Sequence, residues 1–589
     1  MVSYKKRALH AFFVCSFVVL GLAWLVPNHY YPWSSFWSEG LAAFAFALLL
    51  IPAVVSAASP VRLPLISLAV AALSLVPLMQ WQAGQIHFGG DAWMASLYLL
   101  GFGLAALLPA LQRQTSDELL GALAWATLAG ALVSVGLALC QWLGLDGLGL
   151  FLMSMPPDGR PYANLAQPNQ LATLLMLGLV AACALYQRRH LNAVSFTLVV
   201  SVLCFGTAMT QSRTAWLELG GLSLWALVMR ERAALRISRP AVVAIVASFA
   251  LLVMVWPALC EALYLPSGRS LRDASQFASD LRWQLWLSMI DAIGREPWWG
   301  YGWNQVSVAQ FHAAADRLPV GVLIEYSHNI VLDLLVWNGL PLGLLVLAGL
   351  VWWFWSHVRA CRDATLAWLL AGIGVVMVHG LLEFPLEYVY FLLPVGLMIG
   401  AVEVLSPAGR FVRLPKLAVL GPSALAMILL AWTLTEYIKV EEHYRQLRFE
   451  LAGYGPAVDQ AQLSDIVLLT QLREFQRFAR TEARRAMTAG ELDSMRKMAE
   501  RYGYPPVLFR YALATALNGR PAAAARTLTV LCHIHPPERC LEGLDAWESM
   551  AAGSYPEFRA VALPARPSIK IYGTPTYRDK GLSQVSHRP

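Results

Sequence analysis

About thirteen separate stretches of this chain are long and apolar enough to cross a membrane as helices, which need about 20 such residues each. They are centred near residues 18, 48, 72, 101, 131, 178, 201, 222, 252, 342, 374, 397 and 426. Of the 589 residues, 58% are hydrophobic and only 14% are charged, which excludes a soluble protein of this size. The sequence therefore predicts an all-α, polytopic membrane helix bundle.

The positions of lysine and arginine predict the orientation of this bundle, because these residues gather on the cytoplasmic side. If "MVSYKKR" is cytoplasmic, the short outer loops "NHYYPWSSFWSEG", "QAGQIHFGGD" and "LEFPLEY" hold neither residue. The alternate, inner loops hold Arg62, Arg113, Arg188, Arg189, Arg230, Arg232, Arg236, Arg239, Arg359, Arg362, Arg410, Arg413 and Lys416. An odd number of spans then places the C-terminal region outside. The net charge of +7 reflects these arginines, and no base-reading motif indicates a nucleic-acid partner.

Two arginines depart from this distribution and lie in short outer loops. Arg160 is in "PPDGRPYANLAQPNQLA" and Arg213 is in "MTQSRTAW". Either can be a helix-end arginine whose stem follows the apolar surface. An arginine on the translocated side works against membrane insertion, so we expect a function for Arg213, whereas for Arg160 the helix-end interpretation is favoured over a function.

The chain divides into a membrane domain over 1–437, a helical domain over 438–565 and a disordered tail over 566–589. A long outer loop at about 264–328 interrupts the membrane domain, and its segment "LRWQLWLSMIDAIG" predicts folded, helical structure. In the second domain the charge rises and apolar residues recur at helical spacing. There "FRYALATALNGRPAAAARTLTVL" resembles one tetratricopeptide-like helical hairpin.

Only two of the eight cysteines lie in the outer helical domain, in the segment "VLCHIHPPERC". An oxidising compartment favours a disulfide between Cys532 and Cys540. Because His533 and His535 lie between them, a tetrahedral metal site is the alternative, although the spacing matches no known zinc pattern.

Polar residues that suit chemistry on an anionic lipid converge on the predicted outer face. Arginine binds phosphate oxygens through two parallel hydrogen bonds, and a neutral imidazole accepts a proton near neutral pH. A diphosphate leaves without protonation, so one base and two cations suffice. Each residue alone has a structural alternative, such as a helix cap or a polar contact in the bundle. The residues are Asn164, Gln167, Asn169, Gln170, Arg213, Arg282, His328, Asn329, Glu383, Glu387 and Tyr388.

Several segments resemble a known superfamily, and the resemblance covers most of the chain. "LRWQLWLSMIDAIGREPWWGYGWNQ" and "EYSHNIVLDLLVWNGLPLG" resemble the signature region of the O-antigen ligases and polymerases. "GRPYANLAQPNQLATLL" and "HGLLEFPLEYVYFLLP" are similar to the branch of bacterial protein O-oligosaccharyltransferases of the PglL type, the pilin glycosylation ligases. The helical region after residue 438 resembles the extra domain of that branch.

The resemblance implies an inner-membrane glycosyltransferase that moves a preassembled glycan from undecaprenyl diphosphate to a periplasmic or pilin protein. It implies that His328 acts on the acceptor hydroxyl and that Arg213 and Arg282 hold the diphosphate. It also implies roles in activity for Tyr388 and for Gln170, with Gln167 as the alternative glutamine. Further candidates for contact with substrate are Arg160, Asn169, Asn329 and Glu383.

The same resemblance implies no cofactor and no metal, and the outer loops contain no Asp-x-Asp pair. Glu383 and Glu387 are the only pair that argues otherwise. Transfer to lipid A–core, or polymerisation of repeat units, is the nearest rival function. A transporter would need midplane charges and internal repeats. A scaffold protein built on the C-terminal helices would leave Arg213 and His328 unexplained.

Overall fold

The computed structural model describes residues 2–111, 116–156, 159–267, 271–454, 463, 465–553 and 555–567. It divides into two compact units, of which the first covers residues 1–310 and 324–481 and the second covers 311–323 and the chain from 482 onward. These units divide the chain at residue 481, whereas the sequence predicts the boundary at residue 437. Helix α16 (Leu417–Leu451) continues past that point without interruption, and α17 (Thr470–Ala479) packs against both α16 and α5 (Gly89–Leu111) in the first unit.

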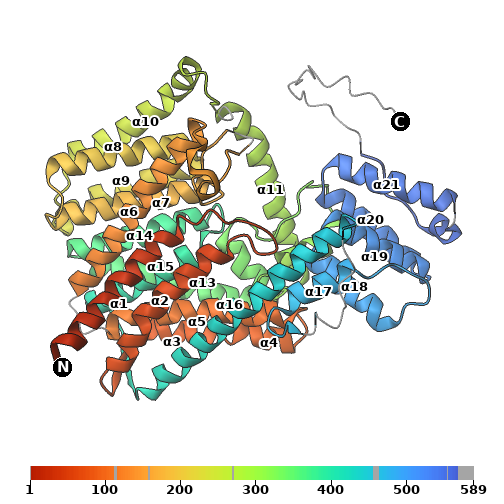
Figure 1. Cartoon of the computed structure of the whole chain (residues 1–589), viewed down its shortest axis with the longest axis horizontal. Coiled ribbons are helices and arrows are strands. Elements are labelled where there is room, and N and C mark those ends of the chain that lie inside the picture. Colours follow the sequence, from red (N-terminus) through yellow and green to blue (C-terminus); the bar gives the residue numbers. More distant parts are fainter. Residues whose placement is uncertain are drawn as a thin grey trace. The chain divides into compact units, whose positions relative to one another are not determined.

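The first unit is built from helices (Figure 1). Each predicted centre of a membrane span lies in one of them. The remaining helices of this unit are α1 (Val2–Ala23), α2 (Phe36–Ser56), α3 (Leu65–Leu73), α4 (Val76–Gln82), α6 (Ser116–Trp142), α7 (Pro168–Gln187), α8 (Ala193–Thr210), α9 (Arg213–Arg232), α10 (Arg239–Ala262), α11 (Leu271–Arg295), α12 (Val306–Ala314, which continues into the second unit), α13 (Ile330–Ala360), α14 (Ala364–Gly380) and α15 (Val389–Leu405), with the short 3-10 helices η1 (Asp146–Phe151) and η2 (Pro385–Glu387).

In the described part of the chain, nine helical segments are long and apolar enough to cross a membrane. Ala11–Ala23, α14 and α15 are apolar but shorter. The one remaining predicted centre, near residue 222, falls in α9, which is less apolar than these helices. The protein is thus a multi-pass, predominantly helical membrane protein.

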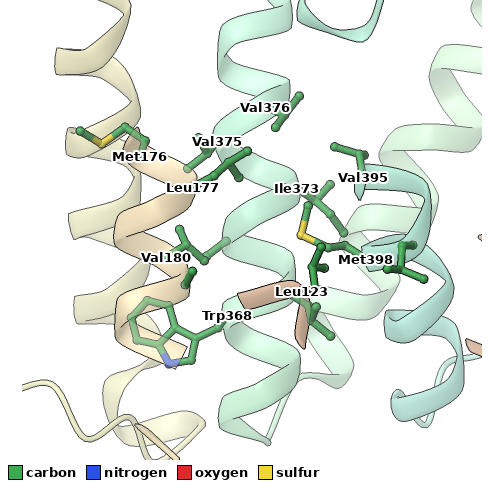
Figure 2. Close-up of a cluster of buried hydrophobic side chains, with 14 of the residues drawn as sticks. Leu123, Met176, Leu177, Val180, Trp368, Ile373, Val375, Val376, Val395 and Met398 are labelled. Carbon is green, nitrogen blue, oxygen red and sulfur yellow. The ribbon is translucent and has the colours of Figure 1, made fainter. Parts of the chain in front are cut away.

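Helix α7 lies at the centre of the first unit, and 83% of the residues in its most apolar stretch are buried. It packs against α6, α8, α9 and α14. Figure 2 shows part of this core, where Leu177 of α7 lies beside Val375 of α14 and Val180 of α7 lies beside Trp368 of α14, with Met398 of α15 on the other side of α14. Helices in a membrane are held by close packing rather than by exclusion of water, so this interdigitation stabilises the bundle.

Small residues let α15 approach α5 closely. Gly396 and Gly400 are four residues apart and lie on one face of α15. A Cβ added at Gly400 would come within 2.0 Å of Ala106 O, and one at Gly396 within 2.9 Å of Phe102 O. This is the small-residue packing that brings membrane helices together.

Helix α13 is broken at Gly339, which has φ 68° and ψ 179°. The loop before it, in "REPWWGYG", covers the break: Tyr301 N donates to Val336 O at 2.8 Å and Leu340 N donates to Pro297 O at 2.7 Å. A Cβ on Gly300, whose φ is 68°, would lie 2.4 Å from Val336 O. Both glycines are therefore required by the backbone, and the loop satisfies groups that the broken helix leaves open.

A two-stranded antiparallel ribbon was not predicted. It joins β1 (Val61–Pro64) to β2 (Phe411–Leu414), and Arg62 stacks over the Phe411 ring at 4.1 Å. Each strand has only four residues and follows an apolar helix, so neither shows a strand pattern in the sequence.

The second unit contains α18 (Ala489–Arg501), α19 (Pro505–Leu517), α20 (Pro521–Ile534), α21 (Pro537–Ala552) and η4 (Pro556–Ala560). Helices α19 and α20 form the predicted hairpin, and Ala512, Ala524 and Trp547 lie in its core. Residues 311–323 join this unit, where Val320 N donates to His533 O at 2.9 Å. The predicted tail from 566 lies, beyond residue 567, outside the described residues.

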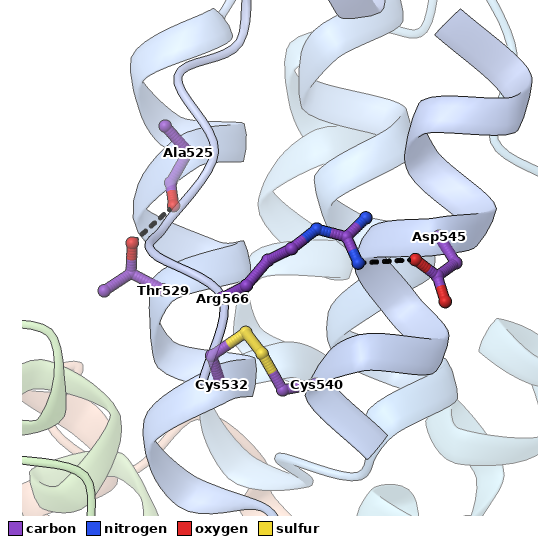
Figure 3. The surroundings of a disulfide bond; sticks show 6 residues. All are labelled: Ala525, Thr529, Cys532, Cys540, Asp545 and Arg566. Atoms are coloured by element: carbon purple, nitrogen blue, oxygen red, sulfur yellow. Dashed lines mark hydrogen bonds and ion pairs between the residues drawn. A yellow bond between two sulfur atoms is a disulfide. The ribbon is translucent and has the colours of Figure 1, made fainter. Parts of the chain in front are cut away.

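The predicted disulfide is present in the second unit (Figure 3). Cys532 at the end of α20 is bonded to Cys540 in α21, with their Cα atoms 4.5 Å apart. The imidazoles of His533 and His535 are hydrogen-bonded at 2.7 Å to the carbonyls of Ala314 and Gly503 respectively. The disulfide therefore joins α20 to α21, and the two imidazoles bind backbone carbonyls. The four side chains do not converge as metal ligands.

Candidate active site

His328 is held in an unusual backbone conformation just before α13. Its φ of 57° lies in the left-handed region, which costs a non-glycine residue about 1 kcal/mol or more. The neighbouring Ser327 fixes this turn, because its N–H donates to Asp333 Oδ1 at 2.8 Å and its carbonyl accepts from Trp286 Nε1 at 3.1 Å. The Asn329 side chain accepts from the first N–H groups of α13 at 3.0 and 3.4 Å, so its oxygen serves as the helix cap.

Glu383, in the loop between α14 and η2, is the hub of the site. Its Oε2 lies 2.7 Å from His328 Nδ1, and its Oε1 accepts from Arg282 Nη2 at 2.5 Å. The amides of Asn169 and Gln167 lie further away, at 3.3 and 3.4 Å. Burial alone would raise the pKa of Glu383, but the hydrogen bond to His328 and the charges of His328 and Arg282 hold that pKa below its ordinary value. The carboxylate is therefore ionised at neutral pH.

Arg213 is the first residue of α9 and follows the N-cap Ser212. Its guanidinium is partly exposed and lies near enough to Arg282 and Glu383 to feel both charges. Arg282 is paired with that carboxylate, whereas Arg213 has no anionic partner among the described residues. Two arginines thus lie near one carboxylate that only Arg282 contacts, which leaves excess positive charge at a helix N-terminus, where anions are favoured.

The remaining predicted arginine and glutamine have structural contacts. Arg160 Nε donates to Thr210 O at 2.9 Å, just before the turn that leads to Arg213. Gln170 is buried, and its Oε1 accepts from the Tyr390 hydroxyl at 2.6 Å. Of the two candidate glutamines, Gln167 is the one that faces Glu383.

A row of aromatic rings connects Gln170 to His328. Tyr390, whose hydroxyl donates to Gln170 Oε1, stacks on Tyr388 with ring centroids 5.2 Å apart. Burial raises the pKa of Tyr388 above its ordinary value. Its ring stacks on Phe384 with centroids 6.1 Å apart, and Phe384 meets the His328 ring edge-on at 5.0 Å. Tyr388 therefore forms part of the wall beside the imidazole.

Sequence reasoning missed Glu39, a buried acid in the first turn of α2. Its carboxylate accepts from Val389 N at 3.3 Å, at the start of α15, and from the Tyr98 hydroxyl. Burial and the nearby charges of Asp333 and Glu39 raise the pKa of Glu387 to about 8. The acid at the start of an apolar span was the available signal, since such acids are rare.

The arrangement pairs an imidazole base with an ionised carboxylate and places two cations beside them. In the described residues, Nε2 of His328 has no hydrogen-bond partner, so it is the nitrogen that can take a proton from a substrate. The excess positive charge favours an anionic ligand.

Family models match three parts of the chain. The model described as "O-Antigen ligase" matches residues 198–347, which contain Arg213, Arg282 and His328. "Protein glycosylation ligase" matches 161–186, and "Virulence factor membrane-bound polymerase, C-terminal" matches 367–542.

Two curated proteins of Acinetobacter baylyi are similar to this chain. The first, a general O-oligosaccharyltransferase, is 30% identical over 548 residues, which cover 91% of this chain and 94% of the relative. The second, a ComP-specific O-oligosaccharyltransferase, is 30% identical over 327 residues, or 55% of this chain and 59% of the relative. This similarity extends through both structural units, and the chain therefore belongs to the bacterial O-oligosaccharyltransferase family of membrane-bound glycosyltransferases.

Proposed function

We propose that this enzyme transfers a preassembled glycan from undecaprenyl diphosphate to a serine or threonine hydroxyl of a periplasmic or pilin protein. One observation carries the proposal: the His328–Glu383 pair lies beside Arg282, while Arg213 has no anionic partner among the described residues. A base and an unneutralised cation are the two components that attack on a diphosphate-linked sugar requires.

His328 is the base in this proposal. Its Nδ1–H points to Glu383, so Nε2 is the nitrogen that takes the proton of the acceptor hydroxyl. The hydroxyl oxygen bonds to the anomeric carbon in the same step. The carboxylate keeps the ring oriented and stabilises the imidazolium that forms. General bases of this kind contribute roughly 10²- to 10⁴-fold to a rate.

Arg213 and Arg282 bind the diphosphate, which leaves with the electron pair of the broken C–O bond. Arg213 contributes a cation that no carboxylate neutralises, and Arg282 bridges the leaving group and Glu383. Guanidinium suits this task because it offers paired donors to phosphate oxygens and stays charged. The donor therefore needs neither a metal nor a general acid.

The reaction takes place at the periplasmic face of the inner membrane. The distribution of arginines between alternate loops supports this orientation. In this orientation we expect the site at the level of the lipid headgroups. The diphosphate then stays at that level, while the acceptor protein approaches from the aqueous side.

The direct test is transfer in vitro from a lipid-diphosphate-linked glycan to a candidate pilin-like protein, followed by mass spectrometry. We expect a glycosylated serine or threonine, full activity with a chelator present, and loss of transfer in His328→Ala with donor binding retained. His190→Ala is the matched control, because His190 is exposed in the loop between α7 and α8.

Labelling of lipid A–core instead of protein would refute the proposed acceptor. Full activity of His328→Ala would refute the base. Loss of activity with chelator, restored by a divalent metal, would mean that the role of Glu383 and Glu387 is metal binding.

A further inference from the structure

Two chains of side-chain hydrogen bonds connect α9, α7 and the end of α14 with its following loop. We call the chain nearer to His328 the upper chain and the other the lower chain. The upper chain lies in the site. Ser212 Oγ, at the N-cap of α9, donates to Asn169 Oδ1 of α7 at 2.7 Å. Asn169 Nδ2 in turn donates to Glu383 Oε1 at 3.3 Å. This upper chain therefore runs from α9 through α7 to the loop after α14.

The lower chain is fully buried and uses three residues that the proposed reaction does not involve. Thr173 Oγ1 of α7 lies 2.6 Å from Glu218 Oε1 of α9 and 2.8 Å from His379 Nδ1 of α14. The three residues are at most 1% exposed. The other polar atoms of the two outer residues, Glu218 Oε2 and His379 Nε2, have no partner among the described residues.

The spacing along α7, and from the end of α14 into the following loop, makes these two chains successive rungs of one ladder. Asn169 and Thr173 are four residues apart on α7, which places them on one face. His379 and Glu383 are also four apart, and Glu383 N donates to His379 O at 2.8 Å. Ser212 is the N-cap of α9 and Glu218 lies six residues later, so on this helix the two rungs are joined by their hydrogen bonds to α7 and not by a four-residue spacing.

The lower rung constrains the geometry because a hydroxyl carries a single hydrogen. Thr173 donates in one direction and must accept in the other. A hydrogen from Glu218 or from His379 therefore completes the rung. Apolar packing tolerates small slides and rotations of a helix, whereas this directional chain through α7 does not.

We propose that Glu218, Thr173 and His379 are positioning residues that set the rotation of α9, and hence the position of Arg213, relative to Glu383. Arg213 has no partner of its own among the described residues, so its helix decides where the guanidinium lies. This inference rests on the proposed role of Arg213 in binding the diphosphate.

The test compares Thr173→Val with Thr207→Val in the purified full-length enzyme, with the lipid-diphosphate-linked glycan titrated at saturating acceptor. Thr207 is equally buried in α8, but its hydroxyl donates at 2.8 Å to Leu203 O of its own helix. We expect Thr173→Val to raise the donor KM roughly tenfold, the effect of one net hydrogen bond, with the acceptor KM unchanged. Thr207→Val should leave both KM values unchanged, and Thr173→Ser should restore the donor KM.

Glu218→Gln distinguishes position from proton transfer, because an amide both donates and accepts but does not ionise. We expect a donor KM close to that of the unmodified enzyme for Glu218→Gln and a raised one for Glu218→Leu. The positioning role is wrong if Thr173→Val matches Thr207→Val, or if Glu218→Gln is as impaired as Glu218→Leu.

Arg213→Lys separates failure of this inference from failure of the proposed function. If Arg213→Lys raises the donor KM and Thr173→Val does not, Arg213 binds the donor and only the ladder is refuted. If Arg213→Lys leaves the donor KM unchanged, the diphosphate site itself is refuted, and the inference falls with it.

Discussion

His328 Nδ1 lies 2.7 Å from Glu383 Oε2, which leaves Nε2 as the nitrogen that can face an acceptor hydroxyl. The same carboxylate binds Arg282 through its other oxygen at 2.5 Å. One side chain thus orients the proposed base and also holds a proposed diphosphate ligand, so changes at Glu383 must affect both.

Glu383→Gln should lower kcat roughly 10- to 100-fold, the range for a group that orients a catalytic side chain. The amide keeps the shape but cannot stabilise the imidazolium. Donor affinity should rise, because the variant removes a negative charge next to the diphosphate. Single-turnover transfer and donor titration measure the two effects, and unchanged kcat would contradict the orienting role.

Arg213→Lys and Arg282→Lys should both weaken donor binding, although each keeps its charge, because ammonium lacks the paired donors of guanidinium. Only Arg282→Lys should also lower kcat strongly, since Arg282 contacts Glu383. Arg236→Lys is the control: this arginine is exposed and stacks on Tyr186 at 4.1 Å. Equal donor KM values in all three variants would exclude the arginine pair as a diphosphate site.

Glu387→Gln should stabilise the protein at alkaline pH. The folded-state pKa of about 8 lies above the ordinary 4.5, because Glu387 is half-buried and lies near the charges of Asp333 and Glu39. Between these two values the unfolded chain has lost the proton while the folded chain keeps it, so stability falls as pH rises. The Tm of the variant in detergent should exceed that of the unmodified protein at pH 8.5 and equal it near pH 4.5. A constant difference across this range would show that Glu387 ionises normally.

Replacement of both Cys532 and Cys540 by serine should destabilise the second unit by about 2–3 kcal/mol, the chain-entropy value for a loop of about nine residues. Nearby contacts such as the 2.7 Å ion pair between Arg566 and Asp545 remain (Figure 3). Local hydrogen exchange in α20 and α21 reports the loss. In the unmodified protein, Cys532 and Cys540 should resist alkylation after unfolding without a reducing agent. Alkylation of both under these conditions would rule the disulfide out.

Reporter fusions should locate residues near 235 in the cytoplasm and residues near 460 in the periplasm. The loop-by-loop arginine distribution is the physical reason. A cytoplasmic signal at the second position would invert the proposed active face while leaving the fold unchanged.

The sequence by itself determined where the helices of the bundle form. Every predicted centre lies in a helix of the structure, including the one near 222 in the less apolar α9. Apolar runs of span length are local features, so they are visible without knowledge of the fold. The hairpin of α19 and α20 and the Cys532–Cys540 pair were predictable for the same reason, because their parts are close in sequence.

Only the tertiary structure decided how the polar residues pair. Glu383 is 55 residues from His328 and 101 from Arg282, and no local pattern records that one carboxylate contacts both. The same holds for the hydrogen bond between Tyr390 and Gln170, for the loop that covers the break at Gly339, and for the division into two units. A hydrogen bond depends on the distance between two atoms in space, and packing of the helices sets that distance.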